Sequence, residues 1–255
     1  MPLVSDRCIC LRKTEYSETS QILTLMSRDY GIFRAIAKGA HRRTKAGASK
    51  FDGGIDFLEL GDAVFTHDPA RDLATLTEWS LREGNLDVRK SLRAIYLGLY
   101  AGELVTRLTE EHDPHPELFD RLEATLVELG TPRREQAFLA FQLDLLRETG
   151  YLADLSRCAD CGRAVDAAGS EPVYFSPARG GVVCRNCESI APDRQELDPR
   201  LLRLVQGILR LPRNNGAILR LPQLTRHQTD PLNRVFASHV EHTLGRRLQM
   251  AKYVT

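Results

Sequence analysis

The chain has 255 residues, of which 42% are hydrophobic and 27% charged, and its formal net charge is only +1. This length suffices for one large core or two small ones, and we expect two domains. No apolar run approaches the roughly 20 residues of a membrane-spanning helix, which argues against a membrane protein. The first residues mix acidic and basic side chains and lack the layout of a secretory signal, so we expect a cytoplasmic protein.

The balanced net charge hides a basic stretch near the N-terminus. Residues 31–50 contain basic side chains and no acidic one, whereas the stretch from Asp52 to Asp72 is mainly acidic. With Arg12 and Lys13 near the first strand, this stretch could neutralise several phosphates along a groove. A charged loop that is simply solvated is the alternative. The candidate residues are Arg12, Arg34, Lys38, Arg42, Arg43, Lys45 and Lys50.

Short apolar stretches separated by glycine and polar residues fill the first eighty residues. They predict a small barrel of five or six strands over residues 1–80, with a basic loop at 39–47 beside it. Phe33 and Phe51 flank this loop, and we expect both in the core rather than stacked on bases. The expected strands are 8–11, 22–26, 32–37, 55–60, 63–66 and 73–77.

Beyond residue 86 the apolar spacing becomes helical, which predicts a mainly helical domain over residues 81–255. Three helices are expected to start where a capping side chain precedes proline, at Thr131-Pro132, Asp198-Pro199 and Asp230-Pro231. Gly130 and Gly150 are expected to end helices. Residues 212–228 do not indicate one structure.

Two CxxC pairs, Cys158/Cys161 and Cys184/Cys187, lie within the helical half. Two such turns can place four thiolates tetrahedrally around one metal, which predicts a structural zinc ribbon at about 155–190. Disulfides or a redox pair fit a cytosolic chain poorly. Cys8 and Cys10 are expected to be buried free thiols on one face of a strand.

Catalytic signatures are missing from the sequence. It contains no GxxxxGK[ST] loop, no HExxH pair and no GxSxG elbow. The closest histidine cluster, residues 112–115, is interpreted as a surface connection between helices. We therefore expect a binding protein rather than an enzyme.

Several short segments together form a specific pattern along the chain. They are YSETSQILTL at 16–25, YG at 30–31, AKGAHRR at 37–43, residues 138–152 around the helix that ends before Gly150-Tyr151-Leu152, CADCG at 158–162, FSP at 175–177, GG at 180–181, Cys184 and Cys187. In this order and spacing they resemble the bacterial RecO family of recombination mediators, and the resemblance covers almost the whole chain.

The resemblance implies an α+β protein in which an N-terminal OB-fold barrel precedes a helical domain with an inserted zinc ribbon. It also implies a bacterial, nucleoid-associated role in DNA repair. Such a protein binds single- and double-stranded DNA, anneals complementary strands, and works with RecR to load RecA onto strands coated with single-stranded DNA-binding protein (SSB). The alternative is a zinc-ribbon module for RNA or a transcription complex, without annealing activity.

Overall fold

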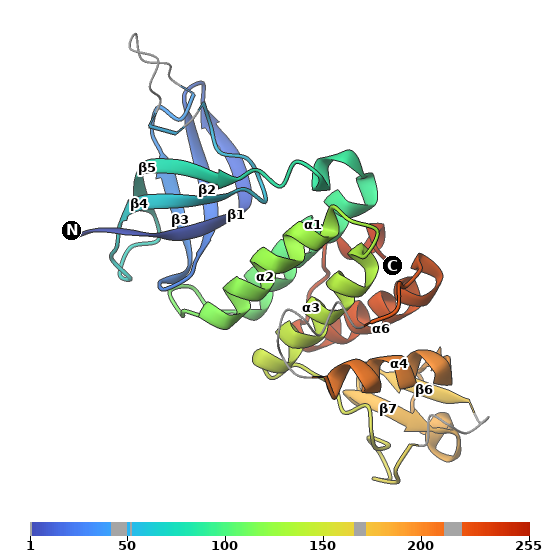
Figure 1. The fold of residues 1–255 in the computed structure, drawn as a ribbon. Coiled ribbons are helices and arrows are strands. Elements are labelled where there is room, and N and C mark those ends of the chain that lie inside the picture. The colour runs from blue at the N-terminus through green and yellow to red at the C-terminus, as the bar shows by residue number, and fades with distance from the viewer. Residues whose placement is uncertain (1, 42–49, 52, 166–171, 212–220) are drawn as a thin grey trace. The chain divides into compact units, whose positions relative to one another are not determined.

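The computed structural model describes residues 2–41, 50–51, 53–165, 172–211 and 221–255. The chain forms two compact units, Met1–Thr131 and Pro132–Thr255. In Figure 1 the first unit contains the strands β1 to β5 and the helices α1 and α2.

A five-stranded closed barrel forms the start of the first unit. Its order is β1-β2-β3-β5-β4, with antiparallel neighbours except for the parallel pair β3–β5. This is the small barrel that the strand pattern predicts and the oligonucleotide-binding (OB) fold that the family resemblance implies. The strands are β1 (Leu3–Ser17), β2 (Ser20–Ser27), β3 (Gly31–Ala37), β4 (Leu60–Thr66) and β5 (Ala74–Glu83).

Inward-facing apolar side chains fill the barrel. The rings of Phe33 and Phe65 stack with their centroids 4.3 Å apart, and Phe51 is also buried in this core. Cys8 and Cys10 are fully buried free thiols, as predicted. Burial of these apolar side chains stabilises the barrel.

The predicted strand at 55–60 is wrong. Only Leu60 belongs to a strand, because the backbone turns at Gly53, Gly54 and Leu58, each of which has a positive φ. Ile55 and Leu58 are still buried. Their apolar character therefore reflects burial of a turn and not membership of the sheet.

Two helices, α1 (Leu92–Leu108) and α2 (Pro116–Leu129), complete the first unit after a short 3-10 turn at Val88–Lys90. Arg28 donates to both carboxylate oxygens of Asp120 at 2.9 Å, and Arg7 lies 3.3 Å from the same group. These contacts join α2 to the barrel. The barrel and both helices belong to the compact unit that ends at Thr131. The domain boundary at residues 80/81 that the sequence suggested stays a prediction.

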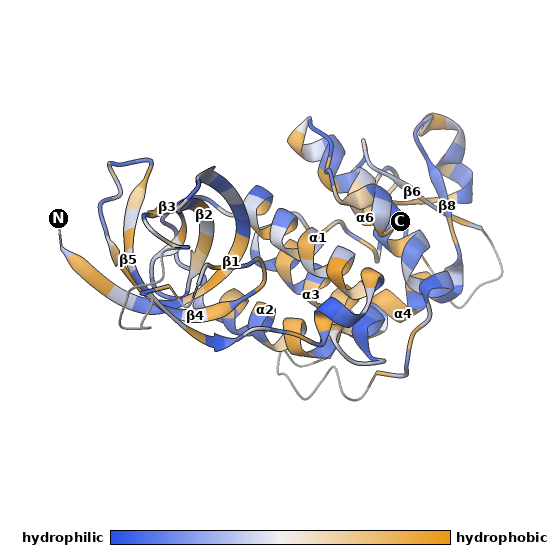
Figure 2. Ribbon diagram, turned by 90° about the horizontal axis from the view of Figure 1, so that it is seen from above, coloured by the Kyte–Doolittle hydropathy of each residue, from blue (hydrophilic) through white to orange (hydrophobic). Residues whose placement is uncertain are grey.

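The second unit combines helices with a three-stranded sheet of order β7-β6-β8. Figure 2 shows apolar residues interspersed with polar ones along its helices. No helix in the described part of the chain has the length and apolar composition needed to cross a membrane. The elements are α3 (Arg134–Glu148), β6 (Val173–Ser176), β7 (Gly181–Cys184), a 3-10 helix (Arg185–Ile190), β8 (Gln195–Leu197), α4 (Pro199–Leu209), α6 (Arg226–Leu244) and a 3-10 turn (Ala251–Tyr253).

One of the three predicted helix starts is confirmed. The Asp198 side chain accepts from Arg200 N–H and caps α4. The other two starts are wrong: the Thr131 hydroxyl donates to Glu128 O and α3 begins at Arg134, while Pro231 lies inside α6.

The actual start of α6 is a capping box. The Gln228 side chain accepts from Thr225 N–H, and the Thr225 side chain interacts in turn with the N3 backbone. Among the predicted helix ends, Gly150 has the expected left-handed φ of 77°, whereas Gly130 ends α2 with an ordinary φ of −72°.

Replacing Gly31 with alanine should strongly destabilise the first unit. Gly31 has φ +71°, and an added Cβ would lie 2.4 Å from the carbonyl oxygen of Asp113. Strain and overlap together should cost about 3 kcal/mol or more. Thermal unfolding followed by the fluorescence of Trp79, the chain's single tryptophan and part of the barrel core, measures this.

Gly84→Ala is the matched control in the same unit. Its Cβ would meet the nearest atom of Leu86 at 3.6 Å, an ordinary contact distance, so the change should stay within about 0.5 kcal/mol. Equal unfolding temperatures for the two variants would contradict the close packing of Gly31 against the backbone of Asp113.

Candidate nucleic-acid interface and metal centre

The outer face of β1, β2 and β3 carries a row of three polar side chains. Arg12 pairs with Thr24 across β1–β2, and Thr24 pairs with Arg34 across β2–β3. Both arginines are exposed. Neighbouring strands lie about 4.8 Å apart, so the backbones of Arg12 and Arg34, on either side of Thr24, are about 10 Å apart.

The two sides of this row differ in their surroundings. On one side, Ile9, Met26 and Ile32 form the next outward positions and are buried. The backbone of Leu11 lies directly against Gly102 of α1, which covers this part of β1. On the other side lie exposed or partly exposed residues, namely Thr14, Ile22, Ile36 and Thr75, which pair across four strands.

Several other cations of the first unit are neutralised by carboxylates. The ammonium group of Lys13 lies 2.9 Å from Asp56, whose other oxygen lies 2.7 Å from Arg89. Arg82 similarly pairs with Asp62 at 2.6 Å. The hydrogen bond to Asp56 raises the pKa of Lys13. Lys13, which the sequence offered as a phosphate contact beside Arg12, is therefore already paired with a carboxylate of the protein.

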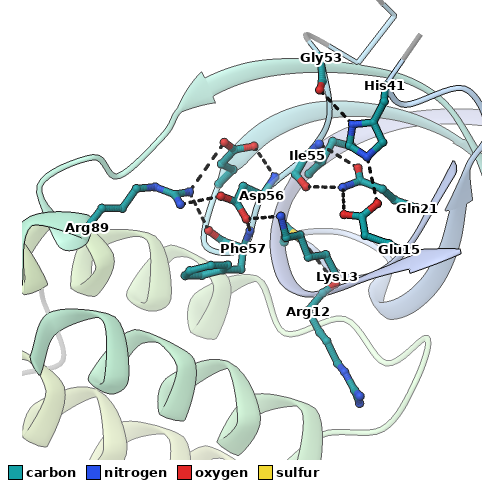
Figure 3. A network of polar contacts seen from close by, with 12 residues as sticks. Arg12, Lys13, Glu15, Gln21, His41, Gly53, Ile55, Asp56, Phe57 and Arg89 are labelled. Atoms are coloured by element: carbon teal, nitrogen blue, oxygen red, sulfur yellow. Dashed lines mark hydrogen bonds and ion pairs between the residues drawn. The ribbon is translucent and has the colours of Figure 1, made fainter. Parts of the chain in front are cut away.

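Arg12 behaves differently from its neighbour Lys13. In Figure 3 its side chain points away from the network that holds Lys13, Asp56 and Arg89. Within the described residues, none of the exposed side chains of Arg12, Arg34, Lys38 and Lys50 has a carboxylate partner. Such cations can bind phosphate without first breaking an ion pair.

Some of the predicted basic residues lie in the described part of the chain and others lie outside it. Lys38 directly follows β3, and the backbone carbonyl of Lys50 accepts from Trp79 N–H on β5 at 2.9 Å. Together with Arg12 and Arg34, these residues come from adjacent segments of the barrel. Arg42, Arg43 and Lys45 lie outside the described residues.

The sector formed by β4 and β5 carries two acidic side chains, of which Asp62 pairs with Arg82. Asp62 on β4 and Glu78 on β5 alternate with inward-facing residues and therefore point outward. Sequence reasoning found the separation of basic and acidic stretches. It missed Thr24 and Thr14, which the period-two alternation of the strands beside Arg12 and Arg34 could have indicated.

Four cysteines meet in the second unit, as the two CxxC pairs predict. One ligand sulfur from each of Cys158, Cys161, Cys184 and Cys187 lies within 4.8 Å of all the others. The sulfurs of Cys161 and Cys184 are 3.8 Å apart. A tetrahedron with 2.3 Å metal–sulfur bonds has edges of about 3.8 Å, whereas a disulfide would need about 2.0 Å.

The backbone around the first CxxC pair builds a tight turn. Gly162 N–H donates to Cys158 O at 2.9 Å, and Gly162 takes the left-handed φ of 69° that this turn needs. Ala159 N–H donates to Val182 O at 2.8 Å and so holds the turn against β7. The second pair spans the end of β7 and the following 3-10 helix.

The Cys158 sulfur is surrounded by backbone donors. Burial raises its pKa, but hydrogen bonds from the backbone at Cys161, Cys184 and Asp160 outweigh burial and lower the pKa to about 6. Because thiolates bind metals, this environment suits a metal ligand. The four-sulfur donor set fits one thiophilic metal ion and leaves Cys8 and Cys10, in the other unit, outside the site.

The two units together define an OB-fold protein with a helical C-terminal part and a four-cysteine centre. The chain belongs to the RecO family: the Recombination protein O N terminal model matches residues 1–85, and the Recombination protein O C terminal model matches residues 89–250. Membership places the chain in a family of DNA repair and recombination proteins.

Full-length relatives support this assignment. The chain is 33% identical to the DNA repair protein RecO of Anaeromyxobacter dehalogenans (strain 2CP-C), over 96% of this chain and 93% of the relative. It is 30% identical to the DNA repair protein RecO of Myxococcus xanthus (strain DK1622), over 100% of this chain and 98% of the relative.

Purified protein should carry one divalent metal ion per chain, because four converging thiolates form a closed site. Elemental analysis should find one equivalent in the wild type and much less in Cys161→Ser. Cys10→Ala is the control and should keep its metal, since Cys10 lies in the barrel core. Equal metal content in the two variants would contradict the site.

Proposed function

We propose that this protein is a non-enzymatic recombination mediator that binds single- and double-stranded DNA and anneals complementary strands. With RecR, it would help RecA load onto DNA coated with SSB. The observation that carries the proposal is the basic surface of the barrel, defined by Arg12, Arg34, Lys38 and Lys50, whose cations have no carboxylate partner in the described structure. Membership in the RecO family supports DNA as the ligand.

Annealing needs no covalent chemistry. Two complementary strands repel each other through their phosphates, and a basic surface that holds both strands lowers this repulsion and raises their local concentration. The row of Arg12, Thr24 and Arg34 offers two charges and a hydroxyl to a phosphate backbone. Contacts of this kind are independent of base sequence, as annealing of arbitrary strands requires.

We further propose that the metal is zinc and that its role is structural. Four thiolates complete a tetrahedron and leave no position for water or substrate, in contrast to a catalytic zinc site. The ion would link the turn at Cys158–Cys161 to the end of β7. Metal binding and folding of this ribbon should then be coupled.

The rival function is an RNA-binding module without annealing activity. An OB fold can bind either nucleic acid, so the barrel alone does not choose between them. The family assignment favours DNA. Tighter binding of an RNA oligonucleotide than of the same DNA sequence, together with no annealing, would favour the rival.

Removing two unpaired cations should weaken DNA binding. We expect Arg12→Ala/Arg34→Ala to lose about tenfold in affinity for a single-stranded oligonucleotide at moderate salt. The slope of log affinity against log salt should fall by about 1.4, because each phosphate contact contributes about 0.7 on single strands. Fluorescence anisotropy over a salt series measures both quantities.

Arg82→Ala is the control because it removes a cation that already pairs with Asp62. It should keep the wild-type affinity and salt slope. If all three proteins bind alike, the basic surface is not the DNA site. If the wild type does not bind DNA, the proposed function fails altogether.

A further inference from the structure

The four cysteines of the metal centre differ in their access to solvent. Cys158 and Cys187 are buried, with relative exposures of 2% and 9%. Cys184 is partly exposed, and Cys161 is exposed. Cys161 lies in a tight turn whose residues 159–164 are all exposed. A small polar reagent in solution therefore reaches the Cys161 sulfur more readily than the other three.

Packing distinguishes Cys161 in the same way. The ribbon has a small apolar core that contains Cys158 and Cys187, and Cys184 packs against it. The Cys158 sulfur also accepts from Cys184 N–H at 3.4 Å. Cys161 does not belong to this cluster of described residues. Of the four sulfurs, that of Cys161 is therefore the least restrained by its neighbours.

The second accessible sulfur lies close to the first. The sulfurs of Cys161 and Cys184 are 3.8 Å apart, and Cys184 is the last residue of β7. A disulfide needs a distance of about 2.0 Å, so the two sulfurs must approach by about 1.8 Å. Rotation of the exposed Cys161 side chain in its turn can supply much of this movement.

We propose that Cys161 is a site of reversible oxidation by peroxides, and that Cys184 converts the oxidised sulfur to a disulfide that takes the place of the metal ion. This inference rests on the proposed metal site and is independent of DNA binding. It assigns different chemical roles to four cysteines that serve alike as metal ligands.

The reaction balances with one peroxide for each disulfide. The Cys161 thiolate attacks one oxygen of hydrogen peroxide, the O–O bond breaks, and hydroxide leaves, which gives the sulfenic acid. The Cys184 thiolate then attacks the Cys161 sulfur, the S–O bond breaks, and a second hydroxide leaves as the disulfide forms. The two sulfurs lose two electrons, and these reduce the peroxide.

This disulfide removes two of the four ligands and joins the same two segments as the metal. Cys158 and Cys187 alone do not complete a tetrahedral site, so the metal ion is released. The turn after Cys158 stays linked to the end of β7 through the new bond, and Ala159 N–H still donates to Val182 O at 2.8 Å. A disulfide within either CxxC pair would provide no such link.

The two thiols of the barrel serve as an internal comparison. Cys8 and Cys10 are fully buried, and burial raises the pKa of both thiols. Because the thiolate is the reactive form, we expect both to stay reduced under the same conditions. Exposure and a neighbouring sulfur, and not the presence of a thiol alone, then determine where oxidation occurs.

The test treats the purified, metal-loaded wild type with hydrogen peroxide. A chromogenic chelator should record the release of about one metal ion for each peroxide consumed. Dimedone present during the reaction should trap the sulfenic acid on Cys161. Without dimedone, mass spectrometry of peptides prepared without reductant should find a disulfide between Cys161 and Cys184. Dithiothreitol with added zinc should then restore the metal content.

Cys10→Ala is the control and should release its metal at the wild-type rate. Dimedone on Cys158 or Cys187, or a disulfide within one CxxC pair, would overturn the assigned roles. Retention of the metal and of all four thiols in excess peroxide would overturn the inference and leave the metal site intact. Absence of metal from the untreated protein would overturn both. None of these results depends on whether the protein binds DNA.

Discussion

The parallel pairing of β3 with β5 closes the barrel, and the arrangement of the first unit depends on it. Ala35, Ile36 and Ala37 pair with Ala74, Thr75 and Leu76, which leaves no free edge between β3 and β5. Once the sheet is closed, alternate residues must point inward or outward. Cys8, Cys10 and Phe33 then fill the interior, while Arg12 and Arg34 are directed to the outside.

Closure alone does not create a binding surface, because surface cations are commonly paired with carboxylates. In the described part of the first unit, some cations are paired with carboxylates and others are not. Arg7 and Arg28 join the barrel to α2 through Asp120, and Lys13 and Arg89 meet at Asp56. These ion pairs hold the unit together and leave the outer face of β1–β3 with cations that are available to an anion.

Much of this arrangement follows from sequence. Alternation predicts the barrel and the buried thiols, and the two CxxC pairs predict the four-sulfur cluster, because both depend on spacing within short segments. The sequence could not predict which cations would pair with a carboxylate and which would not. Whether Arg7 is paired depends on Asp120, which lies 113 residues away, and no local pattern connects them.

The wrong predictions have local physical causes. Residues 55–59 form turns and not a strand, but Ile55 and Leu58 are buried. Their apolar character therefore resembled that of a buried strand. Asp230-Pro231 has the cap-and-proline pattern of a helix start, but α6 begins earlier, at the capping box of Thr225 and Gln228. The contacts of His41 with Glu15 and with Gly53 join three segments of the chain and could be found only from coordinates.

The central claim is that the basic surface of the first unit brings two DNA strands together. The most direct measurement is the annealing rate of complementary strands, each coated with SSB, without nucleotide, at low and moderate salt. We predict that the wild type anneals them, that salt slows the reaction, and that a folded Arg12→Glu/Arg34→Glu variant does not anneal them. A wild type that binds the coated strands without annealing them would contradict the mediator role and leave a general nucleic-acid-binding module.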